Sequence, residues 1–327
     1  MHPILRLGPL DFPSYFTFLT LACGLSILLI WHRARRVGIE PNMMLDFGLL
    51  MIFCGVLGAR LQHVLLDGYF WDYVHLCTDP LQVPGLSLAS GKPCVSDAEC
   101  ALLELGQQCH PDQGTCHSEQ DCWRALKVWY GGFAFYGGLI LCIGVGIFVA
   151  WWKKIGVWRV ADLAGFSVPF GQFIGRLGCW LGGCCFGSPC PSHIGLNYSS
   201  NSGVFQQQVD AGLIANTALL SLPVYPAQLW SAMMNMVIFL LMYFVVYPRR
   251  TFHGACFWSF LLLYGMSRFF VELFRSDERG IWFDGSLTSS QIIALLMILT
   301  GSVMLPIARR KYPLSSFPIE RAPGSWV

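Results

Sequence analysis

The stretch from Ala227 to Tyr247 reads AQLWSAMMNMVIFLLMYFVVY and is followed at once by Pro248, Arg249 and Arg250. It contains no charged residue, and a helix needs roughly 20 consecutive apolar residues to cross the hydrocarbon core of a bilayer. The stretch therefore predicts a transmembrane helix that ends at the arginines. The whole chain has the same character, because 54% of its 327 residues are hydrophobic and only 12% are charged. Soluble domains carry about 25% charged residues, so the composition indicates an integral membrane protein.

Apolar runs of similar length occur elsewhere in the chain. Together they predict seven transmembrane helices, at Phe12–Trp31, Met43–Leu66, Phe135–Trp152, Val160–Trp180, Ala227–Tyr247, Gly254–Phe274 and Leu287–Ile307. The expected fold is therefore an all-α membrane protein with seven transmembrane helices. We do not expect the first run to be a cleaved signal peptide, because no basic segment precedes it and no small-residue cleavage site follows it.

Lysine and arginine are concentrated in alternate connections between these runs, and such connections stay in the cytoplasm. The basic positions are Arg33, Arg35, Arg36, Lys153, Lys154, Arg159, Arg249, Arg250, Arg309, Arg310 and Lys311, whereas residues 181–224 contain neither lysine nor arginine. This asymmetry predicts an N-terminus outside and a C-terminus in the cytoplasm. The net charge is only +2, so the chain is not expected to bind nucleic acid.

The predicted helices divide the chain into six regions. Residues 1–66 hold the first two helices, 67–134 an extracytoplasmic cysteine-rich loop, 135–180 helices three and four, 181–224 an extracytoplasmic cap, 225–311 helices five to seven, and 312–327 a cytoplasmic tail.

The loop at 67–134 is short of large aliphatic residues, so it cannot build an apolar core of its own. It contains six cysteines, Cys77, Cys94, Cys100, Cys109, Cys116 and Cys122. Disulfides are expected there, in agreement with an oxidising compartment, although the sequence does not select the pairing. A zinc site is the alternative, since His110 and His117 lie nearby. No CxxC pair supports the zinc alternative.

Ionisable residues inside the predicted helices are costly, at roughly 2.5–3.5 kcal/mol each on insertion scales, and they usually mark function. They are Asp46, Arg60, Asp162, Arg176, Arg268 and Glu272. The two aspartates lie near the cytoplasmic ends, where capping or pairing is expected. The other four lie toward the outer ends and predict a shared polar cavity. For any one of them, extension of the side chain to the membrane interface is the alternative.

The sixth predicted helix carries Tyr264, Arg268 and Glu272 at i, i+4 and i+8, so they share one face, and Arg275 extends it. Arg268 and Glu272 can form an ion pair. The pair is either a structural contact between helices or part of an anion site, for which the planar fork of arginine is suited.

The fourth predicted helix ends in Gly175-Arg176-Leu177-Gly178-Cys179-Trp180-Leu181-Gly182-Gly183-Cys184-Cys185-Phe186-Gly187. Its glycines permit the close approach of another backbone or of a ligand. Tight helix packing explains glycines alone, but an arginine among them favours a turn that contacts phosphate.

These segments, in this order, resemble the prolipoprotein diacylglyceryl transferase family. The matching motifs are His2-Pro3-Ile4-Leu5, Gly8-Pro9-Leu10, Ser14-Tyr15, Gly58-Ala59-Arg60-Leu61, Phe135-Tyr136-Gly137-Gly138-Leu139-Ile140, Gly175-Arg176-Leu177-Gly178 through Gly187, Tyr225-Pro226-Ala227-Gln228-Leu229, Tyr264-Gly265, Arg268-Phe269, Glu272, Arg275, Ser286-Leu287 and Gln291. The resemblance covers nearly the whole chain except the cysteine-rich loop.

The resemblance implies an enzyme of the bacterial cytoplasmic (inner) membrane that needs no cofactor and no metal. The donor would be phosphatidylglycerol, and the acceptor would be the lipobox cysteine at the signal peptide of a prolipoprotein. Carried over position by position, the catalytic residues would be Tyr15, Tyr136, Tyr264, Arg268 and Glu272. The residues that bind phosphatidylglycerol would be Arg60, Gly175, Arg176, Gly178, Cys179, Cys184 and Gly187.

The chain departs from the family pattern where protons would be handled. The family usually has His at Tyr136, Asn at Cys179, Glu at Cys184 and His at Tyr225, whereas the arginines are kept. Two alternatives to an active transferase follow. One is a non-catalytic relative that binds lipid or lipoprotein, and the other is a membrane thiol oxidoreductase that uses Cys184 and Cys185. No CxxC motif supports the oxidoreductase.

Overall fold

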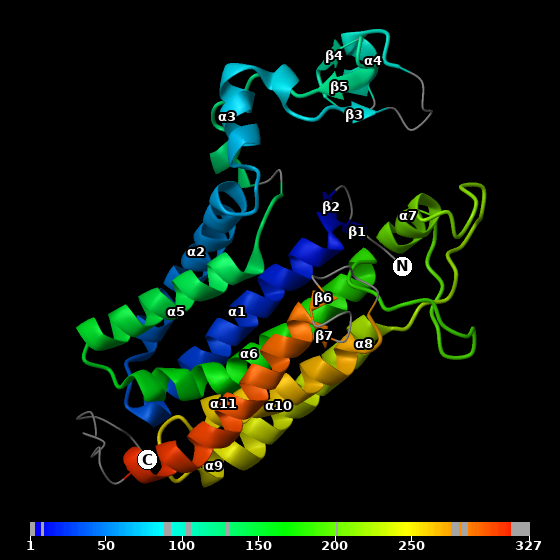
Figure 1. The fold of residues 1–327 in the computed structure, drawn as a ribbon. Coiled ribbons are helices and arrows are strands. Elements are labelled where there is room, and N and C mark those ends of the chain that lie inside the picture. Colours follow the sequence, from blue (N-terminus) through cyan, green and yellow to red (C-terminus); the bar gives the residue numbers. More distant parts are fainter. Residues whose placement is uncertain are drawn as a thin grey trace. The chain divides into compact units, whose positions relative to one another are not determined.

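The structure is a computed structural model, and it describes residues 4–7, 10–87, 93–102, 106–110, 112–128, 131–200, 202–275, 281–282 and 287–314. Most of this part is helical (Figure 1). It forms two compact units, residues 1–48 with 150–327, and residues 49–149. The tail predicted at 312–327 lies outside the described residues beyond position 314, as do parts of the quoted motifs, namely His2-Pro3, Gly8-Pro9 and Ser286.

Each predicted transmembrane segment contains a long helix, although the segments predicted from Phe12 and from Leu287 each begin with two strand residues, at 12–13 and 287–288. The long helices are α1 (Ser14–Ala34), α2 (Pro41–Leu65), α5 (Phe135–Trp152), α6 (Val157–Gly182), α8 (Ala227–Leu240), α10 (Ala255–Glu272) and α11 (Ser289–Lys311). Helix α8 continues through a π-helical segment at Leu241–Val246 into α9 (Tyr247–Arg249). Within the described ranges, five helical stretches are long and apolar enough to cross a membrane: α1, α2, α5, α8 to α9, and α11. Helices α6 and α10 are also long, but they carry most of the charged residues of the predicted site.

The shorter elements lie mainly in the connections. The short helices are α3 (Phe70–Thr78), α4 (Asp97–Leu102) and α7 (Gly203–Asp210), with 3-10 turns at Arg35–Val37, Pro80–Gln82 and Arg124–Leu126. The strands are β1 (Ile4–Leu7), β2 (Leu10–Pro13), β3 (Leu86–Ser87), β4 (Gln108–His110), β5 (Thr115–His117), β6 (Ile281–Trp282) and β7 (Leu287–Thr288). They form two antiparallel hairpins, β1-β2 and β6-β7, and an antiparallel sheet of order β3-β5-β4.

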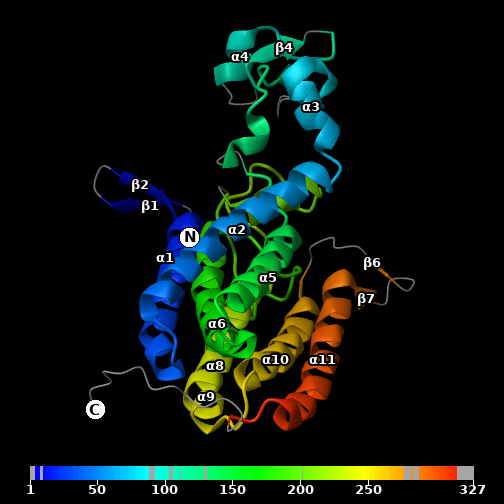
Figure 2. The ribbon, with the colours of Figure 1, turned by 90° about the vertical axis from the view of Figure 1, so that its left-hand side faces the viewer.

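In the first unit, helix α6 packs against α1, α8 and α10, and α10 packs in turn against α11 (Figure 2). A glycine makes one of these contacts possible, because a Cβ atom at Gly165 of α6 would lie 2.6 Å from the backbone carbonyl carbon of Cys256 in α10. Nearby, the carboxylate of Asp162 accepts the backbone N–H groups of Gly254 at 2.9 Å and Cys256 at 2.8 Å. The prediction that Asp162 serves as a cap is therefore confirmed, and the cap fixes the start of α10 on α6.

In the second unit, α2 and α5 approach closely through glycines. A Cβ atom at Gly58 would lie 2.5 Å from the carbonyl oxygen of Gly137. The cysteine-rich loop contains the disulfides Cys77–Cys122, Cys94–Cys109 and Cys100–Cys116, so the prediction of disulfides is confirmed. Since these six sulfur atoms are paired with one another, they offer no thiolates to a metal ion.

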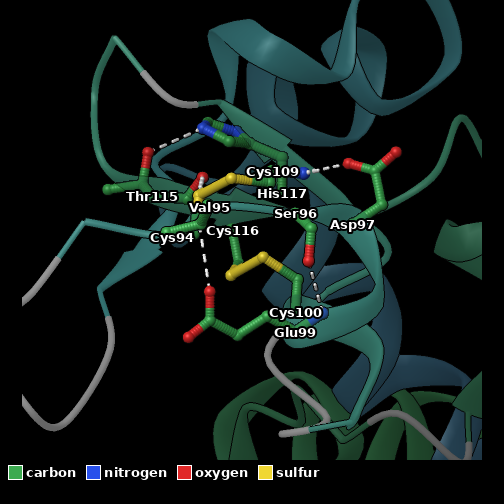
Figure 3. The surroundings of a disulfide bond; sticks show 10 residues. All are labelled: Cys94, Val95, Ser96, Asp97, Glu99, Cys100, Cys109, Thr115, Cys116 and His117. Carbon is green, nitrogen blue, oxygen red and sulfur yellow. Dashed lines mark hydrogen bonds between the residues drawn. A yellow bond between two sulfur atoms is a disulfide. The ribbon is translucent and has the colours of Figure 1, made fainter.

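Figure 3 shows two of these disulfides: Cys100–Cys116 joins α4 to β5, and Cys94–Cys109 joins the segment before α4 to β4. The buried cluster of this part consists of Cys94, Cys100 and Cys116, with Cys109 packed against it. The carboxylate of Asp97 also accepts the backbone N–H of Cys109 at 2.7 Å. Cysteine sulfur therefore takes the place of the aliphatic core that this loop lacks.

Candidate functional site

The start of α1 lies on the glycine-rich end of α6. A Cβ atom at Gly178 would lie 2.7 Å from the Cβ of Phe18 and 3.4 Å from the carbonyl oxygen of Tyr15, and one at Gly182 would lie 3.5 Å from the Cβ of Tyr15. By contrast, no atom outside α6 lies within 4 Å of a Cβ built at Gly175. Tyr15 is 38% exposed at this contact. The predicted site residues Tyr15 and Gly178 are therefore neighbours, although they are far apart in sequence.

Helix α6 ends at Gly183, whose φ of 69° is left-handed and breaks the helical path. Directly after it, the N–H of Cys184 donates to the carbonyl oxygen of Cys179 at 3.1 Å. Cys185 also has a positive φ of 59°, which is uncommon for a residue other than glycine. The turn therefore folds the chain back over the last turns of α6.

This turn brings together three thiols that are not in disulfides. The sulfur atoms of Cys179, Cys184 and Cys185 all lie within 4.8 Å of one another. Cys179 is buried, and the other two are half-buried. Two of them were predicted as site residues, whereas Cys185 was considered only for an oxidoreductase. The sequence does contain a signal for Cys185, because two adjacent cysteines directly after a helix-ending glycine can both lie against the end of that helix.

Arginines surround this group, which we call the three-cysteine cluster, with positive charge. Hydrogen bonds from Cys179 and Cys184, together with the charges of Arg176 and Arg275, hold the pKa of the Cys185 thiol below its usual value. Arg176 is half-buried, and among the described residues no hydrogen bond or ion pair involves its guanidinium group. Arg176 can therefore receive an anion beside the cluster.

Two buried polar residues hold the cluster in place. The side-chain amide of Gln228, at the start of α8, donates to the carbonyl oxygen of Cys184 at 2.9 Å and lies 3.2 Å from the hydroxyl of Tyr198. Both Gln228 and Tyr198 are fully buried. The sequence indicated neither role, although Gln228 stands in one of the quoted motifs.

Gly187 joins the same segment to the end of α10. Its N–H donates to the carbonyl oxygen of Tyr225 at 3.0 Å, and it pairs with Arg275 through an antiparallel bridge. A Cβ atom at Gly187 would lie 2.6 Å from the carbonyl oxygen of Phe274. Glycine is therefore needed here for close packing, and this packing brings Arg275 toward the cluster.

The predicted ion pair on α10 is confirmed, with 3.0 Å between Arg268 and Glu272. Arg268 also donates to the hydroxyl of Ser290 at 3.2 Å, and the hydroxyl of Thr288 donates to the second oxygen of Glu272 at 3.4 Å. Glu272 is only 6% exposed. Thr288 also forms the capping box of α11 with Gln291, so the pair is tied to the start of the next helix. Tyr264, two turns earlier, stacks on Phe260 at 5.4 Å between ring centroids.

Arg60 and Tyr136 belong to the second unit. The guanidinium group of Arg60 donates to the carbonyl oxygens of Ala125 at 2.9 Å, Arg124 at 2.7 Å and Gly132 at 3.1 Å, and also to that of Gly131. Arg60 is 5% exposed, so most of its donors are used to fix the end of the cysteine-rich loop. Tyr136 is 44% exposed at the start of α5, and its ring lies edge-on to that of Phe135.

Comparison with known proteins gives one family. The family model of prolipoprotein diacylglyceryl transferase matches residues 3–88 and 115–307. Among the similar curated proteins are three phosphatidylglycerol–prolipoprotein diacylglyceryl transferases. That of Geobacter sulfurreducens is 30% identical over 58% of this chain and 66% of its own length. That of Symbiobacterium thermophilum is 25% identical over 92% and 90%, and that of Rhodospirillum rubrum is 32% identical over 58% and 64%.

Proposed function

The chain belongs to the prolipoprotein diacylglyceryl transferase family, and we propose that it transfers the diacylglyceryl group of phosphatidylglycerol to the lipobox cysteine of a prolipoprotein. The observation that carries this proposal is the extent of the family match. All the predicted catalytic and lipid-binding residues, from Tyr15 to Glu272, lie within the two matched ranges. The part between these ranges, residues 89–114, belongs to the cysteine-rich loop.

In this reaction the sulfur of the acceptor attacks the glyceryl carbon that carries the phosphate. A carbon–sulfur bond forms, the carbon–oxygen bond breaks, and the electron pair leaves with glycerol phosphate. Negative charge gathers on the departing phosphate, so positive groups fixed beside it lower the barrier. Arg176 and Arg268 are suited to this role, because guanidinium binds phosphate with two parallel hydrogen bonds.

The remaining side chains would orient the two substrates. In this proposal the hydroxyl groups of Tyr15, Tyr136 and Tyr264 donate hydrogen bonds to phosphate or ester oxygens. Glu272 keeps Arg268 in place through its ion pair. Gly175, where a side chain would meet open space, leaves room for lipid beside Arg176.

The proposal includes a topology. Seven helices would cross the cytoplasmic membrane of a bacterium, with the N-terminus and the three-cysteine cluster outside and the C-terminus inside. Five long apolar helices support it, together with the basic residues in alternate connections. Helices α6 and α10 would be the remaining two, packed against α1, α8 and α11 within the first unit.

The test is rescue of a bacterium depleted of its own transferase. We expect the chain to restore growth, and we expect mass spectrometry to find a diacylglyceryl thioether on a reporter lipoprotein. The matched control is Arg268→Ala expressed to the same level, which should fail. If the wild-type protein binds lipid or reporter but leaves the reporter unmodified, the chain is a non-catalytic relative instead.

A further inference from the structure

We propose that Cys179, Cys184 and Cys185 bind a Zn²⁺ ion through three thiolates and leave its fourth position open for the acceptor thiol. The proposed role in catalysis rests on the transferase function, whereas the metal site stands on geometry alone.

The sulfur geometry fits a zinc ion. All three sulfur atoms lie within 4.8 Å of one another, and none is in a disulfide. A Zn–S bond is about 2.3 Å long, so two ligands of a tetrahedral ion lie about 3.8 Å apart. A contraction of about 1 Å or less around the ion would complete the site. Soft thiolate ligands select zinc over magnesium or calcium.

The backbone is arranged to present all three sulfurs. Successive residues in an extended chain point to opposite sides, but the positive φ of Cys185 turns its side chain toward that of Cys184. A non-glycine residue in this conformation is strained and persists where the surroundings impose it. The amide of Gln228 on the carbonyl oxygen of Cys184 is one such constraint.

The local charge is balanced for this ion. Three thiolates and one Zn²⁺ have a net charge of −1, which is unfavourable in a half-buried position unless positive groups lie near. Arg176 lies one helical turn before Cys179 in α6, and Arg275 is paired with Gly187, two residues after Cys185. They supply that charge without occupying a metal position, because a guanidinium group has no lone pair to donate.

The open fourth position distinguishes a catalytic zinc site from a structural one. Among the described residues, the group of potential ligands that includes Cys179 contains no member beyond the three cysteines. The proposed reaction needs a thiolate, and a free thiol has a pKa of about 8.5. A thiol that binds zinc loses its proton, here to water, and remains a nucleophile. Its sulfur then forms the carbon–sulfur bond as glycerol phosphate departs, and the resulting thioether leaves the ion.

This role removes the need for a general base among the side chains. Glu272 is the best proton acceptor by residue type, yet both of its oxygens are engaged by Arg268 and Thr288. Tyr136 is by residue type a hydrogen-bond donor and a poor general base. Metal-assisted deprotonation needs neither residue as a base.

The experiment measures metal binding apart from activity. The full chain is purified in detergent under argon without added reductant, and its zinc content is measured by elemental mass spectrometry. We expect about one Zn²⁺ per chain, as a three-ligand site requires. We also expect Co²⁺ substitution to produce the intense near-ultraviolet band of thiolate-to-cobalt charge transfer. Serine at Cys179, Cys184 or Cys185 should each weaken Co²⁺ binding at least ~10-fold.

Two variants serve as controls. Cys190→Ser removes a free thiol of the same segment that lies outside the three-cysteine cluster, and it should bind Co²⁺ as wild type does. Cys184→His keeps a zinc ligand at its position, and it should bind at least ~10-fold more tightly than Cys184→Ser. If the serine variants lose Co²⁺ binding and Cys184→His keeps it, the loss is due to missing ligands and not to misfolding.

Other outcomes would overturn the proposal. One is wild-type protein that neither contains zinc nor binds Co²⁺, and another is a Cys184–Cys185 disulfide in the argon-purified protein. Full transfer activity after removal of the metal would overturn the catalytic role and leave the transferase function standing. If wild-type protein binds the metal but shows no transfer activity, the transferase function is wrong, whereas the proposed zinc ligands remain supported.

Discussion

The same side chain serves different purposes at different positions in this protein. Arg60 donates to several backbone carbonyl oxygens and is almost fully buried, so it acts as a link within the second unit. Arg268 is held by Glu272 and Ser290, and Arg176 makes no hydrogen bond or ion pair among the described residues. Of these three arginines, Arg176 and Arg268 are the better placed to meet a phosphate group.

Lysine should replace these two arginines poorly, because its ammonium group lacks the planar fork that binds phosphate through two hydrogen bonds. We expect Arg176→Lys and Arg268→Lys each to lose at least ~10-fold in transfer rate, or about 1.4 kcal/mol of barrier. The measurement is the rate of lipidation of a reporter peptide in detergent. Arg36→Lys, at an exposed position, should retain the wild-type rate. Near-full activity of both site variants would remove the phosphate role.

Tyr136 tests whether its position accepts a proton or donates a hydrogen bond. As a residue type, tyrosine is a poor general base but a good hydrogen-bond donor. We expect Tyr136→Phe to reduce transfer and Tyr136→His to be tolerated. An inactive wild type that gains activity in Tyr136→His would instead show that a base is required. If Tyr136→Phe equals an active wild type, the residue serves only in packing.

At the scale of the elements, the helix contacts depend on glycines that are matched to a neighbouring backbone. Gly165 illustrates this, since a methyl group there would meet the backbone of Cys256. Small residues at such crossings let helices approach closely in a membrane, where the hydrophobic effect does not drive their association.

Gly165→Ala should therefore destabilise the protein. The helices α6 and α10 would have to separate, at a cost of roughly 1–3 kcal/mol. Gly24→Ala is the matched control, because a Cβ atom there meets no other atom within 4 Å. Alanine is a better helix former by roughly 1 kcal/mol, so we expect this control to keep or raise the Tm in detergent. Equal Tm values for the two variants would contradict the packing account.

The disulfide loop is an element with a separate source of stability. Replacing Cys100 and Cys116 by serine should remove about 2–4 kcal/mol from the local order of residues 94–117. We expect faster proteolysis within this loop and an unchanged Tm for the helices. In wild-type protein, thiol reagents should label the six loop cysteines only after a reductant is added. Ready labelling without reductant would show that these disulfides are absent.

At the scale of the whole molecule, the distribution of lysine and arginine predicts which ends of the helices face the cytoplasm. Reporter fusions provide the measurement, because alkaline phosphatase is active only outside the cytoplasm and green fluorescent protein only inside. Fusions should be cytoplasmic after Arg36, Lys154, Arg250 and Lys311, and extracytoplasmic after Asp67 and Asn201. An inverted pair would overturn both the topology and the placement of the three-cysteine cluster outside.

The sequence by itself determined the helices of this protein. Long apolar runs can satisfy their backbone groups in a membrane only as helices, so hydropathy and length were sufficient to locate the seven long helices, five of which are long and apolar enough to cross a membrane. It also determined the Arg268–Glu272 pair and the presence of disulfides, because both follow from local spacing or composition. The sequence did not determine which cysteines pair, because pairing depends on how the small sheet brings distant residues together.

The tertiary structure alone decided which residues meet. The contact of Tyr15 with the end of α6, the enclosure of Arg60 by carbonyl oxygens, and the support of Cys184 by Gln228 all join residues distant in sequence. The three-cysteine cluster shows the division most clearly. The sequence supplied its cysteines and the helix-ending Gly183, but only the left-handed turn brought the three sulfur atoms within 4.8 Å of one another. Side-chain direction depends on backbone angles that are fixed by the packing around the turn, and no local pattern encodes that packing.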